Sequence, residues 1–169
     1  VENSSFISIA GVHVDNPSNS GQSLVFINES KNISFTNSEV NGKVDTVYPI
    51  TGPSFGIYVY GDSAGIRLEN NNVHDVQNGV VTFGASNVTI VGNTIDRIGE
   101  DAFKFSNVNG GVIADNIGPK YIYPGVDTHS DFMQFQGAPS SNLVISGNVF
   151  LPQNRFDTQG IFMGGQGGH

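Results

Sequence analysis

The sequence predicts an all-β chain that folds as a right-handed parallel β-helix, and three observations lead to this prediction. The 169 residues include 22 glycines, and only 13% of them are charged, which indicates many turns and little amphipathic helix. A short β-rich stretch recurs along the chain and closes on asparagine or a similar residue. Strand starts at Gly56, Gly79 and Asp101 lie 23 and 22 residues apart, a period at which stacked coils bury each other's apolar faces.

The recurring stretch is seen five times. Its copies are "NISFTNSEV", "GIRLENNNV", "NVTIVGNTI", "GGVIADNI" and "NLVISGNVF", beginning at positions 32, 65, 87, 110 and 142. Alignment of the closing positions superposes Ser38, Asn71, Asn93, Asp115 and Asn148. Asparagine tolerates a left-handed backbone in tight turns, and stacked copies bond to each other through their amides. We therefore expect this column to be structural.

A second strand precedes each copy, beginning at positions 56, 79, 102, 132 and 160, so we expect two strands per coil. Alternation of side chains predicts two inward columns and one outward column. The inward columns are Phe83, Phe105, Phe135 and Met163, and Val81, Phe103, Met133 and Ile161. The outward column is Thr82, Lys104, Gln134 and Phe162. Lys104 and Gln134 are therefore expected to be neighbours on an exposed sheet.

The whole chain, residues 1–169, is expected to be one β-helix domain and a segment of a longer helix. It does not begin with Met, and its last stretch, "GIFMGGQGGH", resembles the first strand of a coil that is not completed. Open solenoid ends expose strand edges that invite pairing. We expect further coils or another subunit to cover both ends.

Charge limits the partners. The formal net charge of −8 argues against nucleic acid or an anionic membrane as the main partner, because the field of the protein repels both. The sequence has no run of eighteen apolar residues, the length that indicates a membrane-spanning helix. It also has no cysteine, which excludes thiol chemistry.

Two coils contain insertions. Asp101 and Asp131 lie 30 residues apart, and Asp131 and Gln159 lie 28 apart. The long turn "KYIYPGVDTHS" carries Tyr121, Tyr123, Asp127 and His129, and the turn "LPQNRFDT" carries Arg155 and Asp157. Counted from the strand starts, Arg155 falls one coil beyond Asp127 and Asp157 one coil beyond His129, at a spacing of about 4.8 Å. Loops on a rigid scaffold commonly carry function.

These residue types suit proton abstraction next to a uronate carboxylate. That chemistry needs a base, a cation that holds the carboxylate, and an Asp that orients an imidazole base. Return of the proton to the opposite face gives epimerisation, and expulsion of the 4-linked sugar gives β-elimination. Asp127, His129 and Lys104 are the catalytic candidates. The expected substrate-binding residues are Arg155, Gln134, Tyr121, Asp131 and Asp157.

Across the whole chain, the repeat resembles the pectate-lyase-like right-handed β-helix superfamily. More narrowly, Tyr123 followed by "DTH" is similar to the catalytic region of mannuronan C5-epimerases, in which a Tyr precedes an Asp-Pro-His motif and a Lys lies on an earlier coil. The resemblance implies that Tyr123, Asp127, His129 and Lys104 are catalytic. This sequence departs from the motif in two respects: Thr128 replaces the proline, and Tyr123 precedes Asp127 by four residues instead of three.

A second enzymatic interpretation comes from "GEDAFKFS" at position 99, which resembles the Gly-Asp-Asp segment of polygalacturonase-like glycoside hydrolases. Glu100, Asp101 and Asp131 then supply the paired carboxylates that hydrolysis uses, because Asp101 and Asp131 share a column. The later Gly-His-Gly and Arg-x-Lys motifs of those enzymes are absent from this sequence. Aligned carboxylates are also able to chelate Ca²⁺. We expect no required cofactor, and the sequence assigns no metal site.

A third interpretation is a noncatalytic attachment β-helix of the tailspike or adhesin kind. In that case the aromatic residues expected at the surface stack on sugar rings without chemistry; they are Tyr121, Tyr123, Phe156 and Phe162. Under every interpretation the expected partner is a polysaccharide, and the expected location is extracellular or at the cell surface.

Overall fold

The structure is a computed structural model of the chain, and it describes residues 1–15, 22–42, 54–122, 129–151 and 158–164. These residues form sixteen β strands and no helix, so the all-β prediction is confirmed. Within the described ranges there is accordingly no helix of the length and apolarity that crossing a membrane requires.

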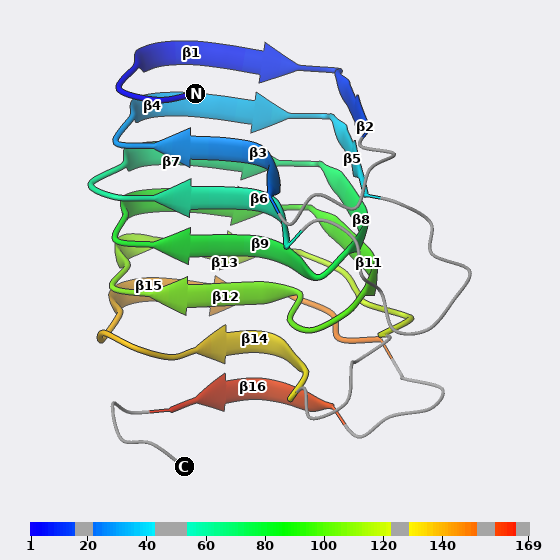
Figure 1. Cartoon of the computed structure of the whole chain (residues 1–169). Coiled ribbons are helices and arrows are strands. Elements are labelled where there is room, and N and C mark those ends of the chain that lie inside the picture. Colours follow the sequence, from blue (N-terminus) through cyan, green and yellow to red (C-terminus); the bar gives the residue numbers. More distant parts are fainter. Residues whose placement is uncertain (16–21, 43–53, 123–128, 152–157, 165–169) are drawn as a thin grey trace.

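The strands form three parallel sheets that stack coil upon coil (Figure 1). The first sheet has the order β1-β4-β7-β10-β13-β15, with strands Ser5–Ala10, Lys31–Thr36, Ala64–Glu69, Ser86–Val91, Asn109–Ala114 and Ser141–Ser146. The second has the order β16-β14-β12-β9-β6-β3, with strands Gln159–Met163, Asp131–Phe135, Phe103–Ser106, Asn78–Phe83, Phe55–Tyr60 and Ser23–Asn28. The third has the order β11-β8-β5-β2, with strands Thr94–Ile98, Asn72–Val76, Glu39–Asn41 and His13–Asp15.

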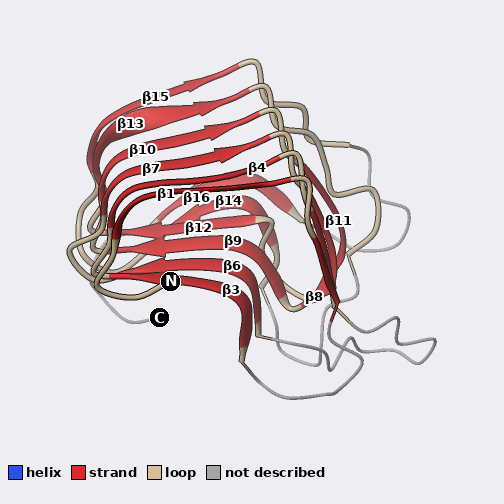
Figure 2. Cartoon of the chain, turned by 90° about the horizontal axis from the view of Figure 1, so that it is seen from above, coloured by secondary structure: helices blue, strands red, loops and turns tan. Residues whose placement is uncertain are grey.

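This arrangement is the predicted parallel β-helix, but its coils contain a third strand that the repeat analysis missed. In the view of Figure 2 the first and second sheets face each other, and the third sheet closes one side. The strands of the third sheet are only three to five residues long. Segments as short as "HVD" and "EVN" are too brief to show the alternation that identifies a strand in a sequence.

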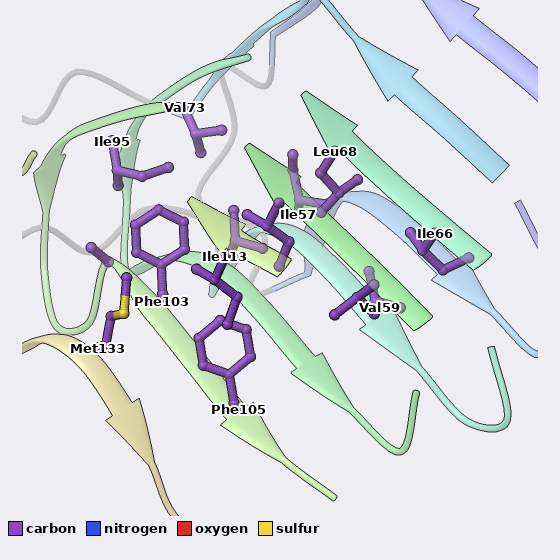
Figure 3. Packing of buried hydrophobic residues seen from close by; sticks show 14 of the residues in the cluster. Ile57, Val59, Ile66, Leu68, Val73, Ile95, Phe103, Phe105, Ile113 and Met133 are labelled. Atoms are coloured by element: carbon purple, nitrogen blue, oxygen red, sulfur yellow. The ribbon is translucent and has the colours of Figure 1, made fainter. Parts of the chain in front are cut away.

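The core is the narrow space between the three sheets, filled by alternate side chains from each strand. Ile57 and Val59 of β6 and Phe103 and Phe105 of β12 point into it (Figure 3). Each of these four side chains is at most 1% exposed. The coils therefore bury one another, as a solenoid requires, because a single coil has too few apolar residues for a core of its own.

The predicted inward columns were wrong by one residue in β9. Val80 pairs with Phe103 and Thr82 pairs with Phe105, so Val81 lies in the outward row beside Lys104. A shift of one residue exchanges the two faces of a strand. Thr82 is consequently buried, and its hydroxyl oxygen has no hydrogen-bond partner among the described residues. Beyond β12 the outward row is as predicted.

That outward row places the residues of the candidate site. Lys104 pairs with Gln134, and Gln134 pairs with Phe162. In β16 the inward-facing Ile161 and Met163 are 50% and 70% exposed. The expectation that further coils or another subunit cover the ends stays a prediction.

The asparagine column exists, with one member changed. The stacked side chains are Ser38, Asn71, Asn93, Asn116 and Asn148. Asn116 takes the place that the sequence analysis gave to Asp115. Asp115 instead has a positive φ of 55° and is exposed at the end of β13. The alignment placed the column one residue early, because an aspartate suits a left-handed turn position as well as an asparagine does.

The amides of Asn71, Asn93 and Asn116 bond to the coils on both sides. The side-chain oxygen of Asn93 accepts hydrogen bonds from the backbone N–H of Asn71, at 2.9 Å, and from its amide nitrogen, at 3.0 Å. The Asn93 amide nitrogen in turn donates to the side-chain oxygen of Asn116 at 3.0 Å and to the Leu68 carbonyl at 2.9 Å. Asn93 is fully buried, so these bonds replace water and fix the register of successive coils.

A charged network ties the coils of the third sheet together. The two ring nitrogens of buried His74 lie 2.6 Å from Asp75 Oδ2 and 2.9 Å from Glu39 Oε1. Hydrogen bonds with these two carboxylates raise the His74 pKa, the Asp75 contact having the larger effect. Arg97 donates to Asp75 from the next coil at 2.7 and 2.9 Å. The network is structural because it joins β5, β8 and β11.

Replacement of Asn93 tests the stacked column. Asn93→Ala removes the acceptor of the buried Asn71 N–H and the amide that donates to the Leu68 carbonyl. We expect the free energy of unfolding to fall by about 2 to 4 kcal/mol in urea titrations. The exposed Asn72 is the matched control, and Asn72→Ala is expected to change stability by less than about 0.5 kcal/mol. Equal losses in the two variants would contradict the structural role of the column.

Candidate functional site

The candidate site lies on the outer face of the second sheet, at β12, β14 and the residues just before β14. Of the predicted site residues, the structure describes Lys104, Tyr121, His129, Asp131 and Gln134. The others lie outside the described residues; they are Tyr123, Asp127, Arg155 and Asp157. Their expected contacts, including the proximity of Arg155 to Asp127, stay predictions.

Lys104 lies among carboxylates. Its Nζ is 3.3 Å from Asp101 Oδ2 and 3.7 Å from Glu100 Oε1. The amide of Asn78, one coil earlier, donates to Glu100 Oε2 at 3.0 Å and holds that carboxylate in place. The Lys104 side chain is only 19% exposed, so its charge is partly shielded from water. Nothing in the sequence around Asn78 in β9 signals this role.

Asp131 lies behind the surface of the site. Its side chain is fully buried, with Oδ2 at 3.2 Å from His129 Nδ1 and at 3.3 Å from the donating amide nitrogen of Gln134. Its backbone N–H donates to Asp101 Oδ1 at 2.9 Å, so Asp101 and Asp131 are stacked on adjacent coils, as their spacing predicts. Asp131 Oδ1 and Gln134 Oε1 are buried without a hydrogen-bond partner among the described residues.

Burial changes the acidity of both aspartates. It raises the pKa of Asp101 from 3.8 to about 7, although the charge of Lys104 acts in the opposite direction. Burial also raises the pKa of Asp131, against the charge of His129 and its hydrogen bond. Near neutral pH, Asp101 is therefore divided between its protonated and ionised forms. A buried carboxyl with such a pKa beside a lysine is typical of functional sites.

His129 is the accessible member of the cluster. Its side chain is 54% exposed, and its ring meets Phe162 edge to face at 5.4 Å between centroids. Asp131 engages Nδ1. When Nδ1 carries the proton, Nε2 has a free lone pair and is able to accept a proton from a ligand. The sequence predicts a pair of His129 with Asp127, whereas the described contact of His129 is with Asp131.

Gln134 and Tyr121 have different surroundings from those expected of substrate ligands. Gln134 is only 5% exposed, and its described bond is to Asp131. Tyr121 lies beside β11, where its backbone N–H donates to Asp96 Oδ1 at 3.0 Å. Lys120 is 5.3 Å from the centre of the Tyr121 ring. These described contacts place Tyr121 at the third sheet.

The described residues do not form a metal centre. Within the ranges that the structure describes, no three or more His, Asp or Glu side chains are arranged to hold a metal ion. Asp101 and Asp131 are the aligned carboxylates considered for Ca²⁺, and Asp101 Oδ2 lies 3.3 Å from the Lys104 ammonium group. A role for Ca²⁺ at this protein stays untested.

Two solved structures are similar to this chain at low identity. One is the surface protein and adhesin PfbA of Streptococcus pneumoniae, with 14% identity, a TM-score of 0.44, and coverage of 97% of this chain and 64% of that one. The other is the alginate lyase of Paenibacillus sp. str. FPU-7, with 12% identity, a TM-score of 0.40, and coverage of 82% of this chain and 66% of that one. This chain thus spans about two thirds of the length of each.

No curated protein matches the sequence. A family model does match, over residues 1–168, and its description is "Right handed beta helix region". This agrees with the three parallel sheets and the stacked asparagines. The chain belongs to the right-handed β-helix family.

Proposed function

We propose that this chain is a carbohydrate-active enzyme that transfers protons on an acidic polysaccharide, by C5-epimerisation or β-elimination of a uronan. The observation that carries the proposal is the exposed imidazole of His129, held through Nδ1 by the fully buried carboxylate of Asp131. Beside this pair lie Lys104, on the outer face of the sheet, and the fully buried Asp101. Because such polysaccharides occur outside cells, we also propose an extracellular or cell-surface location.

The His129 and Asp131 pair supplies the base. A carboxylate behind Nδ1 fixes the imidazole orientation and tautomer and stabilises the imidazolium that forms when Nε2 takes a proton. Asp131 suits this role because it is buried and receives a second hydrogen bond from Gln134. In this scheme His129 removes the C5 proton, while Asp131 is a positioning residue that does not touch the sugar.

Lys104 and Asp101 supply the positive and acidic groups. The C5 proton of a uronate is acidic only when its carboxylate is neutralised by a cation or a hydrogen-bond donor. Ionised Asp101 competes for the Lys104 charge, whereas protonated Asp101 leaves Lys104 with Glu100 alone. The pKa of about 7 at Asp101 therefore favours binding of an anionic sugar in a chain whose net charge is −8.

Epimerisation and elimination differ in the step that comes after proton removal. An epimerase needs a second group that returns a proton to the opposite face of the ring. The resemblance to mannuronan C5-epimerases nominates Tyr123 for this step. A lyase needs no such donor at C5, since the 4-linked sugar leaves instead.

A second candidate function is glycoside hydrolysis, and the stacked carboxyls of Asp101 and Asp131 favour it. Hydrolysis uses one carboxyl that stays protonated and one that is ionised. The pKa of about 7 at Asp101 suits the acid. Burial raises the pKa of Asp131 as well, and the contacts with His129 and Gln134 oppose this effect and favour the ionised form. Hydrolysis would produce new reducing ends without an unsaturated sugar, so the products separate the two functions.

Substitution of His129 tests the proposed base. On alginate and polygalacturonate, we expect His129→Ala to lower kcat by at least about 100-fold, the usual effect of losing a general base. The melting temperature should stay within about 2 °C of wild type, because the side chain is half exposed. The exposed His13 of the third sheet is the matched control, and His13→Ala should keep full turnover. Full activity of His129→Ala, or a loss of folding together with activity, would contradict the proposal.

Asp101 gives a test in the pH dependence of stability. The unfolded chain loses the Asp101 proton near pH 4 and the folded chain near pH 7, so this group lowers stability progressively as the pH rises from 4 to 7. Asp101→Asn removes the titration and keeps an acceptor for the Asp131 N–H. In urea titrations, we expect the variant to exceed wild type by on the order of 2 to 4 kcal/mol at pH 8 and to gain far less at pH 4.

The comparison across pH contains its own control. The difference in the free energy of unfolding between wild type and Asp101→Asn changes with pH only if the Asp101 carboxyl titrates differently in the folded and unfolded chains. A difference that is the same at pH 4, 6 and 8 would show that the Asp101 pKa is not raised. Activity should be lost in Asp101→Asn at every pH if the Asp101 carboxyl is the acid of the reaction.

A further inference from the structure

The outer face of the second sheet continues beyond the candidate site into a group of aromatic side chains. The outward row of this sheet runs strand by strand, in the order Phe26, Tyr58, Val81, Lys104, Gln134 and Phe162. Lys104 thus lies two strands from Tyr58, a distance of about 10 Å at the normal strand spacing. Val81, which is buried, lies between them.

Tyr58 is the centre of a cluster of five rings, which we call the aromatic platform. Its ring centroid lies 4.8 to 5.9 Å from those of its four neighbours, Phe26, Phe55, Tyr60 and Phe83. The rings come from β3, β6 and β9, so three successive coils contribute to the platform. None of the five belongs to the apolar core between the sheets. Tyr60 is 47% exposed, and the other four are partly exposed.

A hollow adjoins the platform at the carboxyl ends of the strands, whereas Asp101, His129 and Asp131 lie at or before the amino ends of β12 and β14. It measures about 330 Å³ and lies at the ends of β6, β9 and β12. Tyr60 and Phe83 supply its aromatic lining, and Asp62, Ser106 and Asn107 supply polar groups. Asn107 is exposed and Asp62 is partly exposed, so their amide and carboxylate are accessible to a ligand. Rings beside hydrogen-bonding groups in an open hollow suit a ligand with both apolar faces and hydroxyl groups.

We infer that the aromatic platform and this hollow bind pyranose units of the polysaccharide at a distance from the acid and base groups. A pyranose ring has apolar C–H faces that stack on aromatic rings, and its hydroxyl groups bond to carboxylates and amides. The strand spacing of about 4.8 Å is close to the rise of one sugar in an extended chain, so successive coils are able to contact successive sugars. Asp62 would repel a uronate carboxylate, so the hollow contacts the sugar through its hydroxyl groups.

The direction of the polysaccharide rests on the proposed function, because only that function places a reacting sugar at His129. The chain would then cross the second sheet obliquely, with one end over the start of β14 and the other over the end of β6. The binding of sugar by the platform does not depend on any reaction. The inference therefore also specifies where a noncatalytic β-helix would hold its glycan.

Affinity measurements on Tyr60 and Phe83 variants test the inference. The probes are alginate, polygalacturonate and mannan, measured by affinity gel electrophoresis and calorimetry in the His129→Ala background, where turnover does not consume them. The reference, called the parent, is the His129→Ala protein, and affinities are compared for the glycan that it binds best. We expect the added change Tyr60→Ala or Phe83→Ala to weaken binding of that glycan by about fivefold to tenfold. Tyr60→Phe keeps the ring and should stay within about twofold of the parent.

Phe6 provides the matched control, because it is 82% exposed and lies on β1 of the first sheet. Phe6→Ala should leave affinity unchanged, and Tyr60→Ala should leave the melting temperature within about 2 °C. The inference is overturned if the parent binds none of the three glycans, if both platform variants bind like the parent, or if Phe6→Ala weakens binding equally. If the wild-type chain binds a glycan, loses affinity when the platform rings are replaced, and forms no product, the proposed function is refuted and this inference is supported.

Discussion

The register between successive coils is the constraint on which this structure depends, and the buried amides of the asparagine column fix it. Asn71, Asn93 and Asn116 each bond to the coil before and to the coil after. Strand side chains alternate with a period of two, so a slip of one residue between coils would turn core residues outward. The outward row that contains Lys104 and Gln134 exists because the register is held. The candidate site is thus a product of the stacking.

The chemistry of the site depends on burial at that rigid face. Asp101 and Asp131 are carboxyls that a flexible loop would leave in water, whereas the backbone of the sheet holds both with no exposed surface. Their raised pKa values oppose folding at neutral pH, because ionisation of a buried carboxyl is costly. The asparagine column and the apolar core offset this cost. A natural chain retains such groups where function requires them, since stability alone would favour their replacement.

Much of the fold was predictable because the repeat is visible in the sequence, and the errors have physical causes. The run "GVVTF" is apolar almost throughout, so its alternation is ambiguous and the register of β9 was assigned one residue too far along. The third sheet was missed because its strands are short. At the site, spacing predicted that Lys104 adjoins Gln134 and that Asp101 stacks on Asp131. The orienting role of Asp131 and the acidity of Asp101 depend on burial, which the sequence does not contain.

The central claim is that this face removes the C5 proton of a uronan, and turnover in D₂O tests it most directly. Alginate and polygalacturonate are incubated with the wild-type chain in D₂O, and the sugars are examined by NMR. The account predicts deuterium at C5, from epimerisation, or 4,5-unsaturated ends, from elimination. Bound polysaccharide that keeps its C5 protons and gains no unsaturated ends would contradict the claim, and new reducing ends in that sample would assign the site to hydrolysis.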